Sequence, residues 1–232
     1  MTDPSARIRH SWQANADAWT RAVREQRIES RRLVTDAAIL SAVAAGPARR
    51  LLDIGCGEGW LCRALAERGS QCVGVDASAP LIEAARQAGG GRFEVMDYAG
   101  LIAEGESLGR FDVLVCNFAL LDESIAPLLL ALRERLDPGG RLLIQTVHPW
   151  SACGDEPYAD GWRLETFAAF GEAFSAPMPW FFRTLESWLA LLAGSGWRVR
   201  QLREPRHPES GRPGSLLLEV QPLGGWVGPG CA

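Results

Sequence analysis

Five polar side chains that could bind or activate a ligand lie at or beside the ends of short apolar runs. Asp76, Asp97 and Asn117 each close such a run, Asp53 lies within another, and His148 follows a fifth. Ligands of open α/β sheets bind beyond the carboxyl ends of the strands, so these side chains are expected at one edge. Carboxylates and an amide there can hydrogen-bond hydroxyl and amino groups, and a histidine can exchange a proton.

Three glycines on alternate positions, Gly55, Gly57 and Gly59, separate an apolar run from a stretch with a helical pattern. Glycine allows positive φ and lets the backbone approach a ligand closely. A dinucleotide-binding loop places its third glycine one position later. Asp53 stands two residues before the first glycine, where a carboxylate suits an ammonium or sulfonium better than a phosphate. An ordinary tight turn between strand and helix is the alternative interpretation.

Asp76 follows the glycine loop at a distance typical of nucleotide-binding α/β folds, about 20 residues. A carboxylate at this position can accept hydrogen bonds from both ribose hydroxyls. The alternative is that Asp76 caps the next helix, a role that suits aspartate chemically. The distance from the glycine loop favours the ribose role.

The segment 51–147 resembles the class I S-adenosylmethionine (SAM)-dependent methyltransferases, with the glycine loop similar to their motif I. The resemblance implies that Asp97 accepts a hydrogen bond from the adenine amine and that the Tyr98 N–H reads an adenine ring nitrogen. Asn117 is a catalytic candidate, because the resemblance places it where motif IV faces the methyl donor. The implied SAM site comprises Trp19, Asp53, Gly55, Cys56, Gly57, Gly59, Asp76, Ala77, Asp97, Tyr98 and Asn117.

Alternating strand and helix patterns predict βαβ units and a parallel sheet. The resemblance implies a Rossmann-like three-layer α/β/α sandwich in one domain, 1–232, whose seven-stranded, mostly parallel sheet has an antiparallel last strand. The expected strands are 51–54, 71–75, 92–96, 112–117, 141–147, 198–203 and 215–221, and the expected helices between and after them are 61–68, 80–88, 125–136 and 184–195.

Residues 1–47 are expected to form a helical N-terminal cap. Trp12 and Trp19 fall on one stripe of its first helix. These tryptophans either pack as core or form a lid over the cofactor, and the sequence leaves both open.

Residues 148–182 break the alternating pattern and are rich in aromatics and prolines. A connection this long in a compact domain is usually functional, so we interpret it as an insertion that forms part of the substrate pocket. Trp150, Trp180 and Arg183 are the pocket candidates. His148 is the candidate general base, and shaping the turn before Pro149 is its alternative role.

Methyl transfer from a sulfonium is an in-line displacement in which positioning provides much of the rate enhancement. A general base is useful for a hydroxyl or thiol acceptor and is not needed for a neutral amine. Arg24, Arg31 and Arg183 are candidates to bind a carboxylate, either of SAM or of the acceptor. His148-Pro149 and Phe182-Arg183-Thr184 look like features of the UbiE/Coq5-like and related groups of small-molecule methyltransferases.

The 232 residues carry a net charge of −4, and every basic residue is arginine. Nucleic acid is therefore an unlikely partner, because binding phosphates needs a basic face. An RNA methyltransferase and a non-catalytic SAM-binding module are the alternatives, and a NAD(P)-dependent oxidoreductase is a third. Without a signal-peptide core, an apolar run near 18 residues or a paired-cysteine motif, we expect a soluble, cytoplasmic, metal-free monomer or homodimer.

Overall fold

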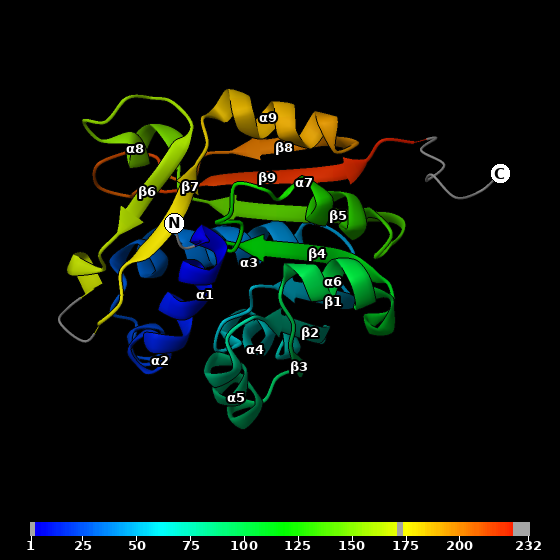
Figure 1. The fold of residues 1–232 in the computed structure, drawn as a ribbon. Coiled ribbons are helices and arrows are strands. Elements are labelled where there is room, and N and C mark those ends of the chain that lie inside the picture. Colours follow the sequence, from blue (N-terminus) through cyan, green and yellow to red (C-terminus); the bar gives the residue numbers. More distant parts are fainter. Residues whose placement is uncertain (1–2, 171–173, 225–232) are drawn as a thin grey trace.

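A seven-stranded sheet forms the centre of the computed structural model, which describes residues 3–170 and 174–224. The strand order is β3-β2-β1-β4-β5-β9-β8, and β9 runs antiparallel to both neighbours. Figure 1 shows the sheet with helices on both faces. The strands are β1 (Arg50–Ile54), β2 (Gln71–Asp76), β3 (Arg92–Val95), β4 (Phe111–Asn117), β5 (Leu136–Thr146), β8 (Trp197–Arg203) and β9 (Leu216–Pro222).

Alternate strand residues face two separate cores, as the period of two along a strand requires. Leu51 packs with helices α3, α4 and α5, whereas its neighbour Leu52 packs with α6, α7 and α9. The α/β/α sandwich and the antiparallel last strand expected from the sequence are therefore confirmed. These helices are α3 (Asp36–Ala44), α4 (Trp60–Ala66), α5 (Ala79–Ala88), α6 (Tyr98–Glu104), α7 (Ala126–Arg133) and α9 (Leu185–Gly194).

The N-terminal cap is helical, as expected, with α1 (Pro4–Ala14) and α2 (Ala16–Arg24) meeting at Asn15. The next helical segment of the cap begins with one turn of π-helix, Arg31–Thr35, before α3. Figure 1 shows α1 beside the carboxyl end of β4, and α2 packs against α5. The cap therefore lies over the edge where a ligand is expected.

The aromatic-rich insertion contains α8 (Pro149–Cys153), a 3-10 turn at Ala168–Phe170 and the antiparallel pair β6 (Gly161–Glu165) and β7 (Met178–Phe182). This hairpin forms its own two-stranded sheet, and β7 lies beside α1 (Figure 1). Within the described residues, no helix is long and apolar enough to cross a membrane.

Two expected boundaries differ from the structure. The helix expected to reach residue 136 ends at Arg133, and β5 already begins at Leu136. Leu136 pairs with Phe111 and Arg141 with Val113, so residues 137–140 bulge out of the ladder. The Asp-Pro-Gly-Gly sequence does turn the chain, but the strand resumes pairing on both sides of the turn. The glycine-rich tail beyond residue 224 lies outside the described residues.

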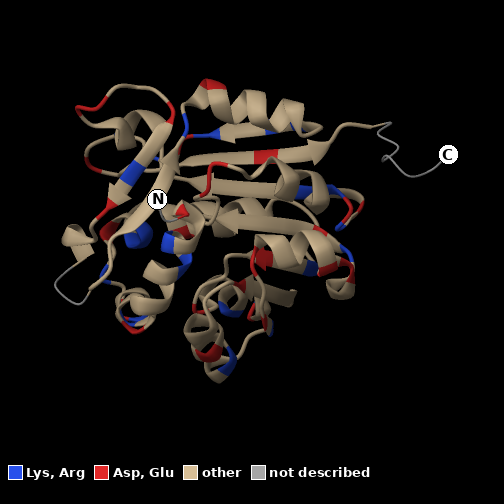
Figure 2. Cartoon of the chain, in the orientation of Figure 1, with Lys and Arg blue, Asp and Glu red and all other residues tan. Residues whose placement is uncertain are grey.

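Arginines and acidic residues are interspersed in the view of Figure 2, and no single element collects the basic side chains. This distribution agrees with the net charge of −4. It offers no basic stripe along one helix of the kind that phosphate backbones require.

Candidate active site

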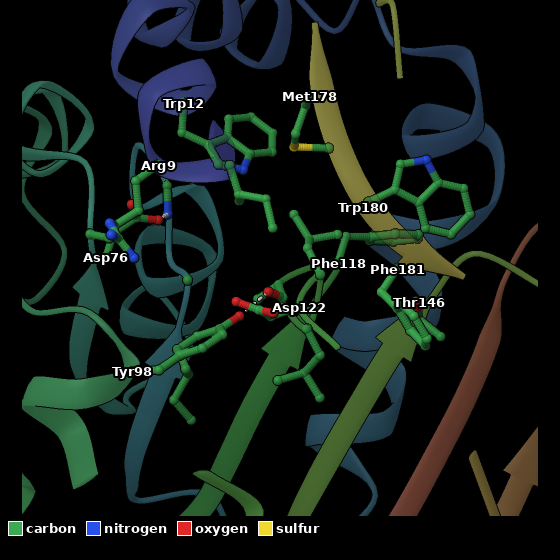
Figure 3. A pocket seen from close by; sticks show the side chains of 18 of the residues that line it. Arg9, Trp12, Asp76, Tyr98, Phe118, Asp122, Thr146, Met178, Trp180 and Phe181 are labelled. Carbon is green, nitrogen blue, oxygen red and sulfur yellow. Dashed lines mark hydrogen bonds between the residues drawn. The ribbon is translucent and has the colours of Figure 1, made fainter. Parts of the chain in front are cut away.

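A cavity of about 730 Å³ opens above the carboxyl ends of the parallel strands. Its walls come from the glycine loop, the N-terminal cap, the loops after β2, β3 and β4, and the insertion. Figure 3 shows side chains from these segments around a common space. Eleven expected site residues line the cavity: Trp19, Gly55, Cys56, Gly57, Asp76, Ala77, Asp97, Tyr98, Asn117, Trp180 and Arg183.

The three glycines all adopt positive φ, between 56° and 79°. A Cβ on Gly55 would lie 2.5 Å from the Cβ of Ala119, so the backbone here approaches the loop after β4 closely. A Cβ on Gly57 would meet Trp19 Nε1 at 3.6 Å, so this glycine faces the space beneath α2. Gly59 does not line the cavity but begins α4.

Asp76 binds the glycine loop directly. Its Oδ2 accepts a hydrogen bond from the Gly57 N–H at 2.9 Å, and its Oδ1 accepts one from the Ser78 N–H at 2.8 Å. Burial raises the pKa of the Asp76 carboxyl, and the two N–H groups act in the opposite direction. The bond to Ser78 fixes the turn before α5, but Asp76 does not cap that helix, because its N-cap is Ser78. Each carboxylate oxygen of Asp76 retains acceptor capacity. The ribose and turn-forming roles are therefore compatible.

Asp53 lies behind the loop, 2% exposed, and does not line the cavity. Burial and the nearby charge of Asp76 raise the pKa of Asp53 from 3.8 to about 7, while the Cys62 thiol, 3.8 Å from Oδ2, and the charge of Arg31 oppose the rise. Asp53 can therefore act on a cationic ligand through space, but it does not contact the cavity.

The raised pKa of Asp53 predicts a pH-dependent stability. The folded state binds this proton more tightly than the unfolded chain, so the Asp53 contribution to the free energy of unfolding falls between pH 4 and 7 and levels off above 7. The loss is roughly 4 kcal/mol at most. We expect Asp53→Asn to remove this part of the slope in denaturant unfolding of the ligand-free protein. A difference curve between variant and unmodified protein that stays flat from pH 4 to 8 would contradict the assignment.

The loop after β3 is tied to its surroundings by two side chains. Asp97 Oδ1 accepts a hydrogen bond from the Gly100 N–H at 2.9 Å and so caps α6. The Tyr98 hydroxyl donates to the Ala119 carbonyl oxygen, and burial raises the pKa of that phenol. Both residues line the cavity, and the second carboxylate oxygen of Asp97 remains available to a ligand.

The end of β4 is fixed by the neighbouring strand. Gln145 Nε2 donates to Asn117 Oδ1 at 2.8 Å, and the Phe118 N–H donates to the Gln145 carbonyl oxygen at 2.7 Å. Phe118 has φ of 55°, which is uncommon for a residue with a Cβ and costs conformational energy. The strained turn brings Phe118 into the cavity (Figure 3). The sequence contained no signal for this conformation.

The arginine candidates in the cap differ in their placement. Arg31 lines the cavity, lies 4.5 Å from the centre of the Trp60 ring and donates to Asp36 at 3.0 and 3.3 Å. Arg24 does not line the cavity and donates instead to Glu58, a buried carboxylate of the glycine loop. Sequence reasoning did not single out Glu58, because an acidic residue between two glycines has no distinctive spacing.

His148 lies outside the cavity. Its ring is buried against Glu204, with Nε2 2.8 Å from Oε1 of that carboxylate. The structure therefore places the expected general base between the insertion and the loop before β9, where it shapes the turn before Pro149. Trp150 is also outside the cavity and is 74% exposed, because it lies on the solvent side of the short helix α8. Neither residue reaches the space where an acceptor would bind.

Two hydrogen bonds of the Asn15 side chain and a cluster of aromatic rings join the cap to the insertion. Asn15 Nδ2 donates to the Ala176 carbonyl oxygen at 2.7 Å, and its Oδ1 accepts from the Ser175 N–H at 2.9 Å. The Trp12 ring lies 5.1 Å from the Trp19 ring and 6.0 Å from that of Phe167. Trp12 and Trp19 therefore contribute to packing and line the cavity at the same time.

Three comparisons place this architecture among known proteins. The model of the methyltransferase domain family matches residues 21–202. A solved SAM-dependent methyltransferase from Mesorhizobium loti has a TM-score of 0.59 at 25% identity, covering 79% of this chain and 97% of its own. The 1,6-didemethyltoxoflavin N1-methyltransferase of Burkholderia thailandensis has a TM-score of 0.65 at 21% identity, covering 96% and 92%.

A curated ubiquinone biosynthesis O-methyltransferase from Cereibacter sphaeroides is 39% identical over 103 residues. The match covers 43% of this chain and only 41% of that protein. A protein of the same name from Brucella anthropi is 35% identical over an equally short segment. The chain thus matches about two fifths of the length of these relatives.

The strand order, the reversed last strand and the cavity at the carboxyl edge define a class I, Rossmann-like methyltransferase. Because the family model spans most of the sequence, the chain belongs to the methyltransferase domain family. The resemblance expected from the sequence is confirmed at this level. The closer likeness to the UbiE/Coq5-like group stays a prediction.

Proposed function

We propose that this protein transfers a methyl group from SAM to a small-molecule acceptor. The observation that supports this proposal most directly is the contact between Asp76 and Gly57 at the cavity wall. The Asp76 carboxylate is held by the Gly57 N–H and lines the cavity, and Gly57 has no side chain to keep a ligand away from the backbone. This arrangement fits a ribose held by Asp76 while the rest of the donor crosses the glycine loop. Asp97 and the backbone of Tyr98 stand at the adenine end.

The methionyl end is assigned to the region beneath α2. There Arg31 and Trp19 line the cavity, and the charge of Arg31 acts on buried Asp53. The guanidinium suits a carboxylate, and the buried charge of Asp53 favours an amino group only through space, without contact. When bound, SAM supplies a methyl group already activated by its sulfonium. The chain's own contribution is alignment of the acceptor at the end of β4, near Asn117 and Phe118, and exclusion of water by the aromatic insertion.

A small-molecule acceptor is supported by the size and the mainly apolar lining of the cavity and by the names of the relatives from ubiquinone biosynthesis. RNA binding would need a basic surface, and the view in Figure 2 shows no helix with a basic stripe. A non-catalytic SAM-binding module would use the same contact between Asp76 and Gly57. Only a measurement of turnover therefore distinguishes such a module from an enzyme. A cytoplasmic location, and a monomeric or homodimeric state, stay predictions.

The test is thermal unfolding with S-adenosylhomocysteine and, in parallel, with NADH. A ligand at 100 times its Kd stabilises by about 2.7 kcal/mol, which raises the Tm of a chain this size by roughly 5–10 °C. We expect this shift with S-adenosylhomocysteine only. Release of S-adenosylhomocysteine from SAM on addition of small acceptors then distinguishes an enzyme from a binding module. A shift with NADH alone would overturn the proposal.

A further inference from the structure

The cavity extends beyond the residues assigned to the cofactor into a second compartment. Its walls are aromatic or apolar and come from both the cap and the insertion. Figure 3 shows Trp12, Met178, Trp180 and Phe181 around this space, with Asp122 below them. Such a compartment suits a flat acceptor, because large apolar faces gain most from leaving water. The apolar walls comprise Trp12, Trp162, Phe167, Met178, Trp180 and Phe181.

Asp122 brings a carboxylate to this compartment from the loop after β4. The Ser5 hydroxyl of α1 donates to its Oδ2, and the Glu123 N–H donates to its Oδ1 at 2.7 Å. Arg183 Nη2 donates to the carbonyl oxygens of Asp122 and Glu123, each at 2.6 Å. The carboxylate is thus held by α1 and by its own loop, and Arg183, which follows β7, holds the backbone of that loop.

Arg183 serves as a positioning residue for this loop. It is 5% exposed, and its guanidinium lies 5.3 Å from the centre of the Trp188 ring. Burial lowers the pKa of Arg183, and the nearby charges of Asp160 and Asp122 oppose that effect. The sequence suggested that Arg183 binds a carboxylate of the acceptor. Because its Nη2 donates to two backbone oxygens, Arg183 is poorly placed for that role.

The charge balance of the compartment is negative. The carboxylates of Asp122 and Glu165 line it together with the buried guanidinium of Arg183, so two negative charges stand against one positive charge. Within residues 3–170 and 174–224, no arginine forms an ion pair with either carboxylate. Arg31 is engaged by Asp36. A cationic ligand would therefore meet two carboxylates and several aromatic faces, and an anionic ligand would meet repulsion.

We propose that Asp122 determines acceptor specificity by binding a protonated amine carried by an aromatic acceptor. The ammonium pairs with Oδ1 or Oδ2, the aromatic walls hold the ring system, and Trp12 and Trp180 supply π-faces for the cation. The carboxylate of Glu165, which also lines the cavity, adds to the negative potential there. This inference rests on the proposed function, because it assigns the second compartment to the methyl acceptor.

The experiment uses three probes that share one ring system: tryptamine, its neutral alcohol tryptophol and the anion indole-3-propionate. Binding to the full chain saturated with S-adenosylhomocysteine is measured by calorimetry or ligand-observed NMR at pH 7.5. We expect tryptamine to bind at least tenfold more tightly than the other two. In Asp122→Asn this preference is expected to fall about tenfold, while tryptophol binding changes less than twofold.

Asp155→Asn is the matched control, because it removes one carboxylate charge from an exposed position of the insertion outside the cavity. It is expected to keep the tryptamine preference. The comparison of probes on the unmodified chain needs no variant, so it stands even if Asp122→Asn fails to fold. Ser5→Ala, which keeps the charge but removes its hydroxyl donor, is expected to weaken tryptamine binding less than Asp122→Asn does.

Equal binding of tryptamine and tryptophol, tighter binding of indole-3-propionate, or an unchanged preference in Asp122→Asn would overturn the inference. So would absence of tryptamine binding at millimolar concentration. If S-adenosylhomocysteine itself fails to bind the unmodified chain, the proposed function fails. If it binds and no preference for the amine is found, only the role of Asp122 is lost.

Discussion

Replacement of Asp76 by alanine is expected to weaken S-adenosylhomocysteine binding roughly 100-fold. The carboxylate is assigned two hydroxyl hydrogen bonds of the ribose, each a bond to a charged group that contributes about 1.5 kcal/mol. The variant also releases the Gly57 N–H, which donates to Asp76 Oδ2 at 2.9 Å, so the loop beneath the ligand loses a restraint. Calorimetric titration of the variant and the unmodified chain measures the change in Kd.

Asp112→Ala is the matched control for this experiment. Asp112 Oδ2 also accepts hydrogen bonds from two backbone N–H groups, those of Arg49 and Arg50, each at 2.9 Å, but at the opposite edge of the sheet. The control is expected to lose stability and to keep its affinity for the ligand. Equal losses of affinity in the two variants would mean that Asp76 acts only by supporting the fold.

Replacement of Gly59 by alanine is expected to destabilise the protein by about 2–5 kcal/mol. Gly59 has φ of 79°, a conformation that costs a residue with a Cβ roughly 1–2 kcal/mol. The added Cβ would also lie 2.8 Å from Phe93 Cζ and 3.0 Å from the Cβ of Ala85, which forces the packing to shift. Denaturant unfolding without ligand measures the loss.

Gly69→Ala separates the two contributions. Gly69 has φ of 90°, but nothing lies within 4 Å of the position that an added Cβ would take, so only the conformational cost applies. We expect this variant to lose about 1–2 kcal/mol, clearly less than Gly59→Ala. Similar losses in both variants would show that the core beneath the glycine loop adapts freely to an added methyl group.

Much of the fold follows from local patterns in the sequence. The parallel strands are apolar runs because both of their faces are covered by helices, and the glycine loop reveals the first strand-to-helix turn. The start of β5 at Leu136 did not follow, because a turn signal of proline and glycines hides a strand that pairs on both sides of it. The π-helical turn at Arg31–Thr35 has no distinct sequence pattern either.

That Asp76 and Asp97 line the cavity was predictable, since they stand at or just after strand ends and strand ends converge. The acceptor half of the site was not. Asp122 lies in a loop five positions beyond the end of β4, and its orientation depends on Ser5, which is 117 residues away in the chain. His148 follows a strand end as well, yet the hydrogen bond to Glu204 turns it from the cavity. Strand-end position therefore identifies candidates, and long-range contacts select among them.

The contacts of the buried carboxylate Glu58 bear on the order in which ligands bind and dissociate. It accepts hydrogen bonds from Arg24 of α2 at 2.9 Å and from Arg63 of α4 at 2.7 Å, so moving α2 away from the glycine loop would strip a desolvated charge of a partner. The insertion is joined to the cap by the neutral hydrogen bonds of Asn15 and by aromatic contacts such as that of Trp12 with Phe167, and separating these leaves no buried charge without a partner. We therefore expect the insertion to open more readily than α2, so that the proposed acceptor and its product exchange while the donor stays bound. Such an arrangement favours a sequential kinetic order in which the donor binds first and its demethylated form leaves last.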